Sequence, residues 1–457
     1  MKQKSGFSGQ IGFVLAAAGS AVGVGNLWRF PYLAAKDGGG LFLIIYLVLV
    51  LTVGFTLLTT DIAIGRKTGK SAIYAYESMR KKWKFLGVIT FIVPVIIMTY
   101  YAVIGGWILK YIAIYILGSG KEAVADNCFT NFITSPSSVW YGIIFMLLTA
   151  IIVYNGVEKG IERVSKFIMP VLLVMVVGIA IFSLTLKTTL DDGTVRTGLQ
   201  GLKVYLTPDM SGITVQKFLQ VSLDAMSQLF FSLSVSMGIM ITYGSYMRKE
   251  DNIESSVRQI EVFDTLVAFL SGLIIVPAVF VFSGGDENAL NAGPSLMFIT
   301  LPNVFKEMLG GQIVGAVFFL LVVLAAMTSS ISLMETVVSI VEERFHWKRI
   351  PSCLIVTGIS FLIGLLSVFG YSIWSDFTIF HMQFLDFFDY ISNNIMMPIV
   401  ALMTCVLVGF VVKTTFVEDE IEKNARFRVK GLYRVMIKFI CPICMLLILF
   451  SALFLKL

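Results

Sequence analysis

Long apolar segments alternate with short polar ones along almost the whole chain. A helix needs about 20 predominantly apolar residues to cross a bilayer. Eleven segments are about this long or longer, at 10–35, 41–66, 86–117, 138–156, 163–186, 217–246, 259–283, 311–342, 351–370, 377–412 and 433–456. Several exceed the thickness of a bilayer, which predicts tilted helices. The pattern therefore predicts an all-α integral membrane protein, with one transmembrane domain over residues 1–457.

The first apolar segment contains an interruption where a membrane helix should be continuous. Gly19, Gly23 and Gly25 lie close together, and Asn26 and Arg29 follow them. Glycine at this density weakens a helix, because its backbone loses the most entropy on ordering. Backbone groups freed inside a membrane need protein or a polar cavity to satisfy them. The glycines alone are equally consistent with close helix packing, but the amide and the cation favour a binding site.

A second interruption lies in the sixth segment. Ser232, Ser234 and Ser236 occur at alternate positions, and Gly238 follows. Serines in membrane helices often bond only to the preceding turn, but this cluster corresponds in position to the first interruption. The two breaks open two five-helix halves, 10–186 and 217–412, and 433–456 is an additional helix. Paired breaks of this kind predict an inverted-repeat transporter with its binding site near the membrane midplane.

The distribution of basic residues predicts the orientation. Lysine and arginine gather on one side of the predicted helices, before residue 10 and around 66–84, 159–166, 248–249, 344–349 and 423–434. The other side carries a thin scatter such as Lys121, Lys187 and Lys203. Because basic loops stay in the cytoplasm, we expect a multi-pass protein of the cell membrane with a cytoplasmic N-terminus and an external C-terminus. On the outer side, 284–309 is too apolar for a solvated linker and too broken to span, which predicts a capping or re-entrant loop.

Composition excludes several other classes. The 457 residues are 57% hydrophobic and 14% charged, which is typical of a protein in contact with membrane lipid. The net charge of +6 comes from loop residues and does not indicate nucleic-acid binding. Two histidines are too few for a histidine-rich metal site. The five cysteines give no disulfide framework, and Cys441 and Cys444 lie within an apolar helix pattern, where packing explains them better than redox chemistry.

The interrupted segments also carry a family resemblance. The run from Asn26 to Pro31, the glycines 38–40, the run from Ile241 to Tyr246 and the hydroxyl run 328–330 resemble the neurotransmitter:sodium symporters, in the bacterial eleven-helix branch. The resemblance covers essentially the whole chain. It implies the leucine-transporter-type fold and sodium-coupled uptake of an apolar L-amino acid by alternating access, without enzymatic activity.

The resemblance further implies two sodium ions beside the breaks. Sodium is a hard cation and prefers oxygen ligands, as calcium does. The first site would use Ala21, Asn26, Ser232 and Asp264 together with the substrate carboxylate. The second site would use the carbonyls of Gly19, Val22 and Ala325 and the hydroxyls of Thr328 and Ser329.

The amino-acid site follows from the same resemblance. Its expected residues are Ser20, Ala21, Gly23, Val24, Gly25, Ile97, Tyr101, Phe231, Ser232, Ser234, Ser236, Met237 and Leu333. Backbone groups at the breaks would hold the carboxylate and ammonium, and apolar side chains would enclose the substrate side chain. Ser20, Ser236 and Met237 depart from the better-known bacterial pattern, and Ser236 occupies a position often held by glycine. This difference favours aliphatic over larger substrates.

The resemblance also implies two gates. The cytoplasmic gate would involve Lys4, Phe7, Tyr246 and Glu343, and the outer gate would pair Arg29 with Asp389. Arg29 alone could be a cation that reaches the membrane interface.

Asp264 bears on the ion requirement. Asp264 could be an acid at the cytoplasmic interface, but by the resemblance it aligns with a residue that binds sodium in the family. Ala268 occupies the position of a hydroxyl residue that binds chloride in the chloride-dependent members of the family. A fixed carboxylate there predicts chloride-independent transport.

Other classes are consistent with parts of the pattern. A membrane channel or an amino-acid sensor would also line a pathway with small and polar residues. A membrane enzyme is less consistent, because no histidine–carboxylate or serine–histidine set occurs.

Overall fold

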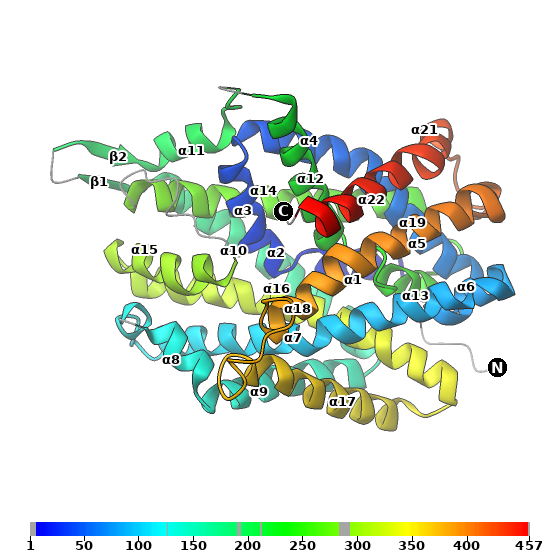
Figure 1. Ribbon diagram of the computed structural model, residues 1–457, viewed down its shortest axis with the longest axis horizontal. Coiled ribbons are helices and arrows are strands. Elements are labelled where there is room, and N and C mark those ends of the chain that lie inside the picture. The colour runs from blue at the N-terminus through cyan, green and yellow to red at the C-terminus, as the bar shows by residue number, and fades with distance from the viewer. Residues whose placement is uncertain (1–5, 126, 190–192, 211–212, 283–292, 456–457) are drawn as a thin grey trace.

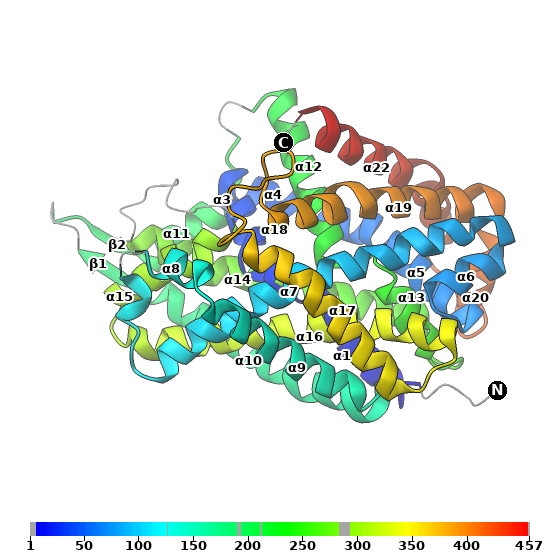
Figure 2. The same ribbon diagram turned by 60° about the horizontal axis from the view of Figure 1, so that its bottom comes forward.

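The computed structural model describes residues 6–125, 127–189, 193–210, 213–282 and 293–455. Long helices run side by side along the long axis of the molecule, and the connecting segments gather at its two ends (Figures 1 and 2). Within the described residues, nine continuous helical stretches are long and apolar enough to cross a membrane. Two further crossings are broken helices. The predicted all-α fold with eleven crossings is therefore confirmed.

The first five crossings form the first repeat. They are α1 (Gln10–Ala21), α2 (Val24–Leu27) and α3 (Arg29–Lys36) together; α4 (Gly40–Leu49), η1 (Val50–Gly54) and α5 (Phe55–Thr68); α7 (Lys84–Ile116); α9 (Ser137–Tyr154); and η4 (Val157–Glu162) with α10 (Arg163–Leu184). The π-helical turns η1 and η4 continue their helices.

The next five crossings form the second repeat, and one more follows. They are α12 (Val215–Ser232) with α13 (Ile239–Tyr246); α14 (Ile253–Phe282); α16 (Gly311–Phe345); α17 (Arg349–Phe369); α18 (Phe384–Asp389), η7 (Tyr390–Met396), α19 (Met397–Val406) and η8 (Leu407–Val411); and finally α21 (Lys430–Val435), η9 (Met436–Ile440), α22 (Cys441–Phe450) and η10 (Ser451–Leu455). The tenth crossing starts at 384 rather than at the predicted 377, because 377–383 forms turns.

Short elements occupy the connections. They are α6 (Ala72–Met79), η2 (Lys81–Trp83), η3 (Glu122–Val124), α8 (Cys128–Thr134), β1 (Lys187–Thr189), β2 (Val195–Thr197), α11 (Gly198–Leu206), η6 (Leu296–Thr300), α15 (Leu301–Glu307) and α20 (Thr415–Ile421). The antiparallel β1–β2 hairpin, with Lys187 opposite Thr197, was not predicted. The expected capping loop is partly seen: Leu296, Phe298 and Leu301 are buried in η6 and α15, whereas 284–292 lies outside the described residues.

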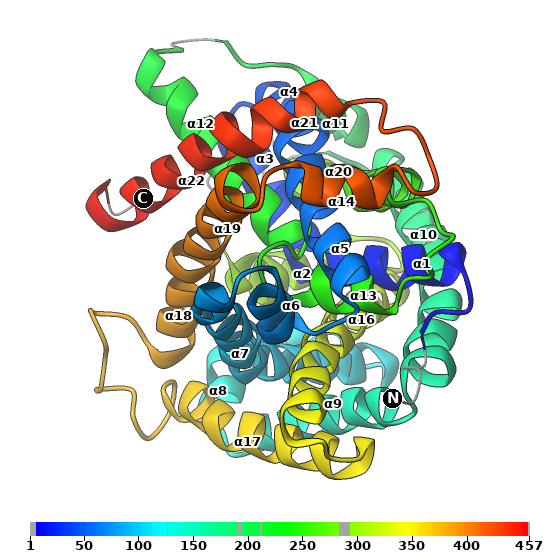
Figure 3. The same ribbon diagram turned by 90° about the vertical axis from the view of Figure 1, so that its right-hand side faces the viewer.

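The helices that carry the two breaks lie in the centre of the bundle. Viewed along the bundle, α2 and α13 lie near the middle, with α7, α9, α10, α17 and α19 around them (Figure 3). Every residue of α16 from Ala325 to Ile340 is buried, and α1 is buried along most of its length. A helix buried on all sides has no face towards solvent, so the hydroxyls and acids of α16 need partners within the protein. The fold thereby places both breaks in the interior of the bundle.

Candidate functional site

The first break separates α1 from α2 by two residues, Val22 and Gly23, whose backbones are extended. Asn26 is fully buried, and its side-chain oxygen accepts a hydrogen bond from the Gly23 backbone N–H at 3.0 Å. The amide thus satisfies one of the donors that the interrupted helix leaves free. This explains why a carboxamide follows the glycine run.

The second break is longer and has a less favourable backbone. Between Ser232 and Ile239 the chain leaves the helix, and Ser234 (φ 52°), Ser236 (φ 63°) and Gly238 (φ 76°) adopt left-handed conformations. Such conformations cost a non-glycine residue of order 1–3 kcal/mol and persist only when the surroundings hold them. The strain is therefore offset by contacts from other helices.

Two of these contacts come from the first repeat. Asp61 of α5, a buried carboxylate, accepts a hydrogen bond from the Ser236 backbone N–H at 3.0 Å. The Ser234 hydroxyl donates to the Ser20 carbonyl at 2.9 Å, beside the first break. The second break is thus joined directly to the first and is also held by α5.

The predicted first sodium site is assembled around Asp264. Asn26 Nδ2 donates to Asp264 Oδ1 at 2.8 Å, and the Ser232 hydroxyl donates to the same oxygen at 2.8 Å. The Tyr46 hydroxyl lies 3.4 Å from Oδ2. Asp264 is fully buried and therefore depends on these donors. The Asp264 carboxylate and the Ser232 hydroxyl supply oxygen atoms, the ligand type that a hard cation requires.

The predicted second site lies between α1 and α16. The Ser329 hydroxyl donates to the carbonyls of Ser20 at 3.1 Å and Val22 at 3.4 Å. The Thr328 hydroxyl donates to the Ala325 carbonyl at 3.0 Å. Gly19 packs against Thr328 so closely that an added Cβ would lie 3.2 Å from the threonine Cβ. All five predicted positions are therefore adjacent, with their oxygens at one helix crossing.

A small cavity of about 30 Å³ lies between the breaks. It is lined by Ser20, Ala21, Gly23, Asn26, Ile97, Tyr101, Phe231, Ser232, Ser234, Met237, Ile239, Ser329 and Leu333. This volume is enough for about two water-sized probes, so an amino acid enters only if wall side chains move.

Three predicted substrate residues lie outside this lining. Val24 lines the cavity described next, Gly25 packs against Phe231, and the Ser236 N–H is bonded to Asp61.

A second cavity, of about 400 Å³, lies above Phe231 and Tyr101 and contains both residues of the predicted outer gate. Arg29 donates to the Ser227 hydroxyl at 2.8 Å, and Asp389 accepts from Asn393 at 2.7 Å. No ion pair joins Arg29 to Asp389 within the described part of the chain. The direct pair expected from the sequence is thus not formed in this conformation, because the cavity lies between its members.

The opposite end of the site is packed closed. The Phe7 N–H donates to the Tyr246 carbonyl at 3.1 Å, and the Phe7 ring meets the Tyr243 and Tyr246 rings at 5.5 and 6.4 Å. The Tyr246 hydroxyl donates to Glu335 at 2.8 Å, and Arg349 forms an ion pair with the same buried carboxylate. This end is sealed by aromatic packing and a buried ion pair.

Two further residues, Glu343 and Lys4, were predicted for the cytoplasmic gate. Glu343 accepts a hydrogen bond from the Ser71 N–H at 2.9 Å, two turns of α16 beyond Glu335. Lys4 lies outside the described residues.

The sequence interpretation overlooked Asp61, Glu335 and Arg349. A signal was available for both acids, since a lone carboxylate within an apolar helix is by default functional. The sequence could not identify their partners, which come from distant segments.

Comparisons with known proteins identify the family to which the chain is similar. The model of the sodium:neurotransmitter symporter family matches residues 4–119 and 129–456. An uncharacterized sodium-dependent transporter of Haemophilus influenzae is 32% identical over 470 residues, with 99% of each chain covered. The uncharacterized sodium-dependent transporter YhdH of Bacillus subtilis is 32% identical, over 97% of this chain and 96% of that protein. The crystal structure of MhsT in complex with L-phenylalanine has a TM-score of 0.87 at 33% identity, covering 98% of this chain and 100% of that chain.

Proposed function

The chain belongs to the sodium:neurotransmitter symporter family, and on this premise we propose that it uses a sodium gradient to move an apolar L-amino acid into the cell. One observation carries the proposal: two interrupted helices meet at a buried cavity that is lined by residues of both breaks and by apolar side chains. Exposed amides suit a carboxylate and exposed carbonyls suit an ammonium group. The cavity therefore matches the two ends of a zwitterion.

Each end of the substrate has candidate partners. The backbone amides near Val24 and Gly25, with the Tyr101 hydroxyl, hold the carboxylate. The carbonyls of Ala21 and Ser232, near the Ser234 hydroxyl, accept the ammonium protons. Gly23 keeps the first break accessible, since an added Cβ would lie 2.9 Å from Ser329 Oγ and 3.4 Å from the Tyr101 hydroxyl.

The substrate side chain faces an apolar wall of Ile97, Phe231, Met237 and Leu333. The printed ligand of MhsT, L-phenylalanine, is consistent with an apolar substrate for a protein of this fold. We expect a preference for aliphatic side chains, because the cavity is small and position 236 holds a serine where glycine would leave more room.

Two sodium ions accompany the substrate. One ion binds between Asn26, Ser232 and Asp264 and contacts the substrate carboxylate, so each increases the affinity for the other. The second ion binds between the carbonyls of α1 and the hydroxyls of Thr328 and Ser329, and it holds the first break against α16. Both sets consist of oxygen ligands, as a hard cation requires.

Asp264 also removes the need for chloride. Its carboxylate is buried beside Tyr46, and a bound sodium ion there would otherwise leave an uncompensated positive charge in a poorly solvated site. Gln228 donates to the Gly25 carbonyl at 3.4 Å, and its side-chain oxygen is buried and unpartnered in the described structure. Ala268 contributes no hydroxyl. A resident carboxylate therefore supplies the negative charge.

Transport follows from alternating closure of the two ends. With a cytoplasmic N-terminus, as the basic loops favour, the packed end at Phe7 and Tyr246 faces the cytoplasm and the C-terminus lies outside. Arg29 and Asp389 then approach each other across the outer cavity after substrate binds, and the ion pair of Glu335 with Arg349 opens.

Uptake into proteoliposomes tests the proposal. Purified protein should accumulate radiolabelled leucine above the external concentration when sodium is high outside, and not when choline replaces sodium. A channel would only equilibrate leucine across the membrane, and a sensor would bind leucine without uptake. Equal uptake in sodium and choline would refute the coupling.

A further inference from the structure

Two neighbouring surface grooves at the N-terminal end of the bundle form one amphipathic site. The polar groove, of about 640 Å³, is lined by Asn252, Glu254, Ser255, Arg258, Gln259 and three residues of the 422–429 connection, Ala425, Arg426 and Arg428, with Val262 and Phe263 at its edge. The apolar groove, of about 540 Å³, runs between α4–η1 and α14 and is lined by residues such as Leu43, Leu47, Leu51, Val262, Leu266 and Phe269. The two grooves share Arg258 and Val262.

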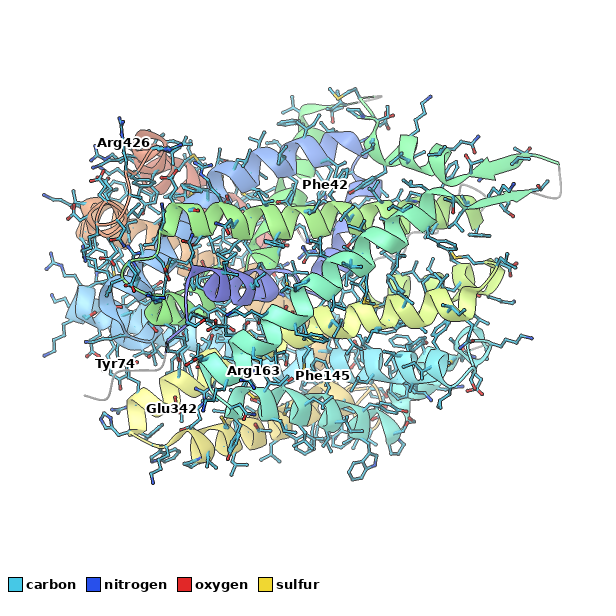
Figure 4. All side chains as sticks on the ribbon, turned by 180° about the vertical axis from the view of Figure 1, so that it is seen from behind. Phe42, Tyr74, Phe145, Arg163, Glu342 and Arg426 are labelled. Carbon is cyan, nitrogen blue, oxygen red and sulfur yellow. The ribbon has the colours of Figure 1, made fainter. Side chains whose placement is uncertain are left out.

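The polar groove carries an excess of positive charge. Arg258 forms an ion pair with Glu254 at 3.1 Å, and its guanidinium lies over the Phe55 ring at 5.0 Å. Arg426 and Arg428 are exposed, and among the described residues neither guanidinium group forms an ion pair with a carboxylate. Three arginines against one glutamate leave two positive charges in the lining. Figure 4 shows Arg426 at the same end of the molecule as Tyr74 and Glu342.

The connection that carries these arginines is held in place. Phe427, between them, is buried and packs on the Tyr433 ring at 5.4 Å, so its two neighbours point outward. The Arg428 N–H donates to Glu254 at 3.2 Å. At one end of the connection, hydrogen bonding to Arg434 lowers the pKa of Glu418 to about 2, so this anchor stays ionised at neutral pH. The two guanidinium groups are therefore presented by an ordered segment.

Along α14 a charged group is followed by apolar groups, in the same order as the headgroup and acyl chain of a lipid. Arg258 lies in the second turn of the helix, and the apolar lining begins with Val262, one turn deeper. Glu261 lines the apolar groove but is 3% exposed, and its Oε1 points toward Gly54, where an added Cβ would lie 3.7 Å away. The open surface of the groove is thus apolar directly below the arginines.

We propose that this paired groove binds one anionic phospholipid, with its phosphate on Arg258, Arg426 and Arg428 and an acyl chain between α4–η1 and α14. Basic pockets at a membrane surface attract anionic headgroups, and guanidinium groups recognise phosphate in a bidentate manner. The lipid would bind on the outside of the helices that carry Tyr46 and Asp264. The site is separate from the proposed transport cavity, and binding can be measured without transport.

Native mass spectrometry of the purified full-length protein tests the site. The protein is incubated with equal amounts of palmitoyl-oleoyl phosphatidylglycerol and the matching phosphatidylcholine. We expect selective retention of phosphatidylglycerol, and about a thirtyfold loss of affinity for it in the Arg426→Ala/Arg428→Ala variant, since each basic residue near the surface contributes about a factor of five. The matched control, Arg80→Ala/Arg344→Ala, removes two exposed arginines of the same end and should retain the lipid.

Further measurements separate the other outcomes. Val262→Trp fills the junction of the grooves at an exposed position and should reduce lipid retention while leaving every arginine in place; it also keeps the test decisive if the double variant unfolds. Equal loss in the test and control variants would mean non-specific charge attraction. Complete displacement by soluble glycerol 3-phosphate would mean a phosphate site without an acyl chain. Either result, or unchanged retention in both Arg426→Ala/Arg428→Ala and Val262→Trp, overturns the proposal.

Discussion

The two helix breaks face the same cavity but are built differently. The first is short, has glycine at its centre and is closed by its own Asn26, which lies three residues away from its partner Gly23. The second is longer, has serines in left-handed conformations and is held by Asp61 from another helix. The first break is therefore determined by residues next to it in the sequence, whereas the second depends on a tertiary contact.

This difference has an energetic consequence. Glycine adopts an irregular backbone without steric cost, so the first break is able to change shape as ions bind and leave. Ser234 and Ser236 hold a strained backbone that relaxes when its tertiary contacts are lost. We expect the second break to be the more fragile of the two, and four predictions test this comparison.

The largest effect should follow removal of the support of the second break. Asp61→Ala leaves the Ser236 N–H buried without an acceptor, at a cost of about 1–3 kcal/mol, and allows the serine segment to relax. Sodium-driven leucine uptake should fall to background. Because the proposed second sodium site uses residues of the first break and α16 only, stabilisation of the protein against heat by sodium should persist.

Asp61→Asn is the matched control, since it keeps an oxygen acceptor of the same size and should retain measurable uptake. If Asp61→Ala transports leucine normally, the second break does not depend on this carboxylate. If Asp61→Ala loses both uptake and stabilisation by sodium, then the structure of the first break also depends on the second.

The next prediction concerns Asp264, which is bonded to Asn26 of the first break and Ser232 of the second. Wild-type uptake should be equal in chloride and gluconate media. In the Asp264→Asn/Ala268→Ser variant the fixed charge is removed and a hydroxyl is added, so uptake should become chloride-dependent, with at least a tenfold difference between media. A chloride requirement in the wild type would contradict the assignment, and the single Asp264→Asn variant should be poorly active in both media.

A smaller effect is expected from a methyl group in the first break. In Gly25→Ala the new Cβ would lie 2.6 Å from the Phe231 ring, which must shift away from the substrate. We expect the KM for leucine to rise several-fold with little change in thermal stability. The matched control is Gly178→Ala in α10, where nothing lies within 4 Å of the added Cβ; its uptake should be normal and its stability equal or higher, since alanine favours helix by up to about 1 kcal/mol. Identical kinetics in the two variants would show that Gly25 has no role in positioning Phe231.

The difference between the two breaks also explains how much of the structure could be predicted from the sequence. The spans follow from apolar length alone, and the first break follows from its glycine density, because both signals are local. Asn26, Ser232 and Asp264 were expected together only through the family resemblance, and the structure places them within hydrogen-bonding distance. No local pattern indicates that Asp61 binds a backbone 175 residues away.

Other features depend on conformation or on tertiary contacts. Arg29 and Asp389 are both present, but whether they touch depends on the closure of the outer cavity, which the sequence does not encode as a single state. The β1–β2 hairpin consists of two three-residue strands, too short to give a clear alternating pattern. The left-handed backbone of Ser236 was equally hidden, since serine is not a residue that normally predicts it.

The smallest effect should come from relieving that strain. In Ser236→Gly the φ of 63° becomes unstrained, but glycine also gains entropy in the unfolded chain, and these terms, each of about 1 kcal/mol, largely cancel. The N–H to Asp61 is kept, so the second break should persist with nearly unchanged thermal stability. Loss of the Ser236 side chain should leave more room next to Met237, its neighbour in the chain, which lines the cavity, and should improve competition by tryptophan against leucine uptake by a few-fold. Ser165→Gly, a buried serine of α10 outside the cavity lining, is the control and should leave the competition unchanged. If tryptophan outcompetes leucine in the wild type already, or gains nothing from Ser236→Gly, then the second break does not set substrate size, and its serines serve only to hold the interrupted helix in place.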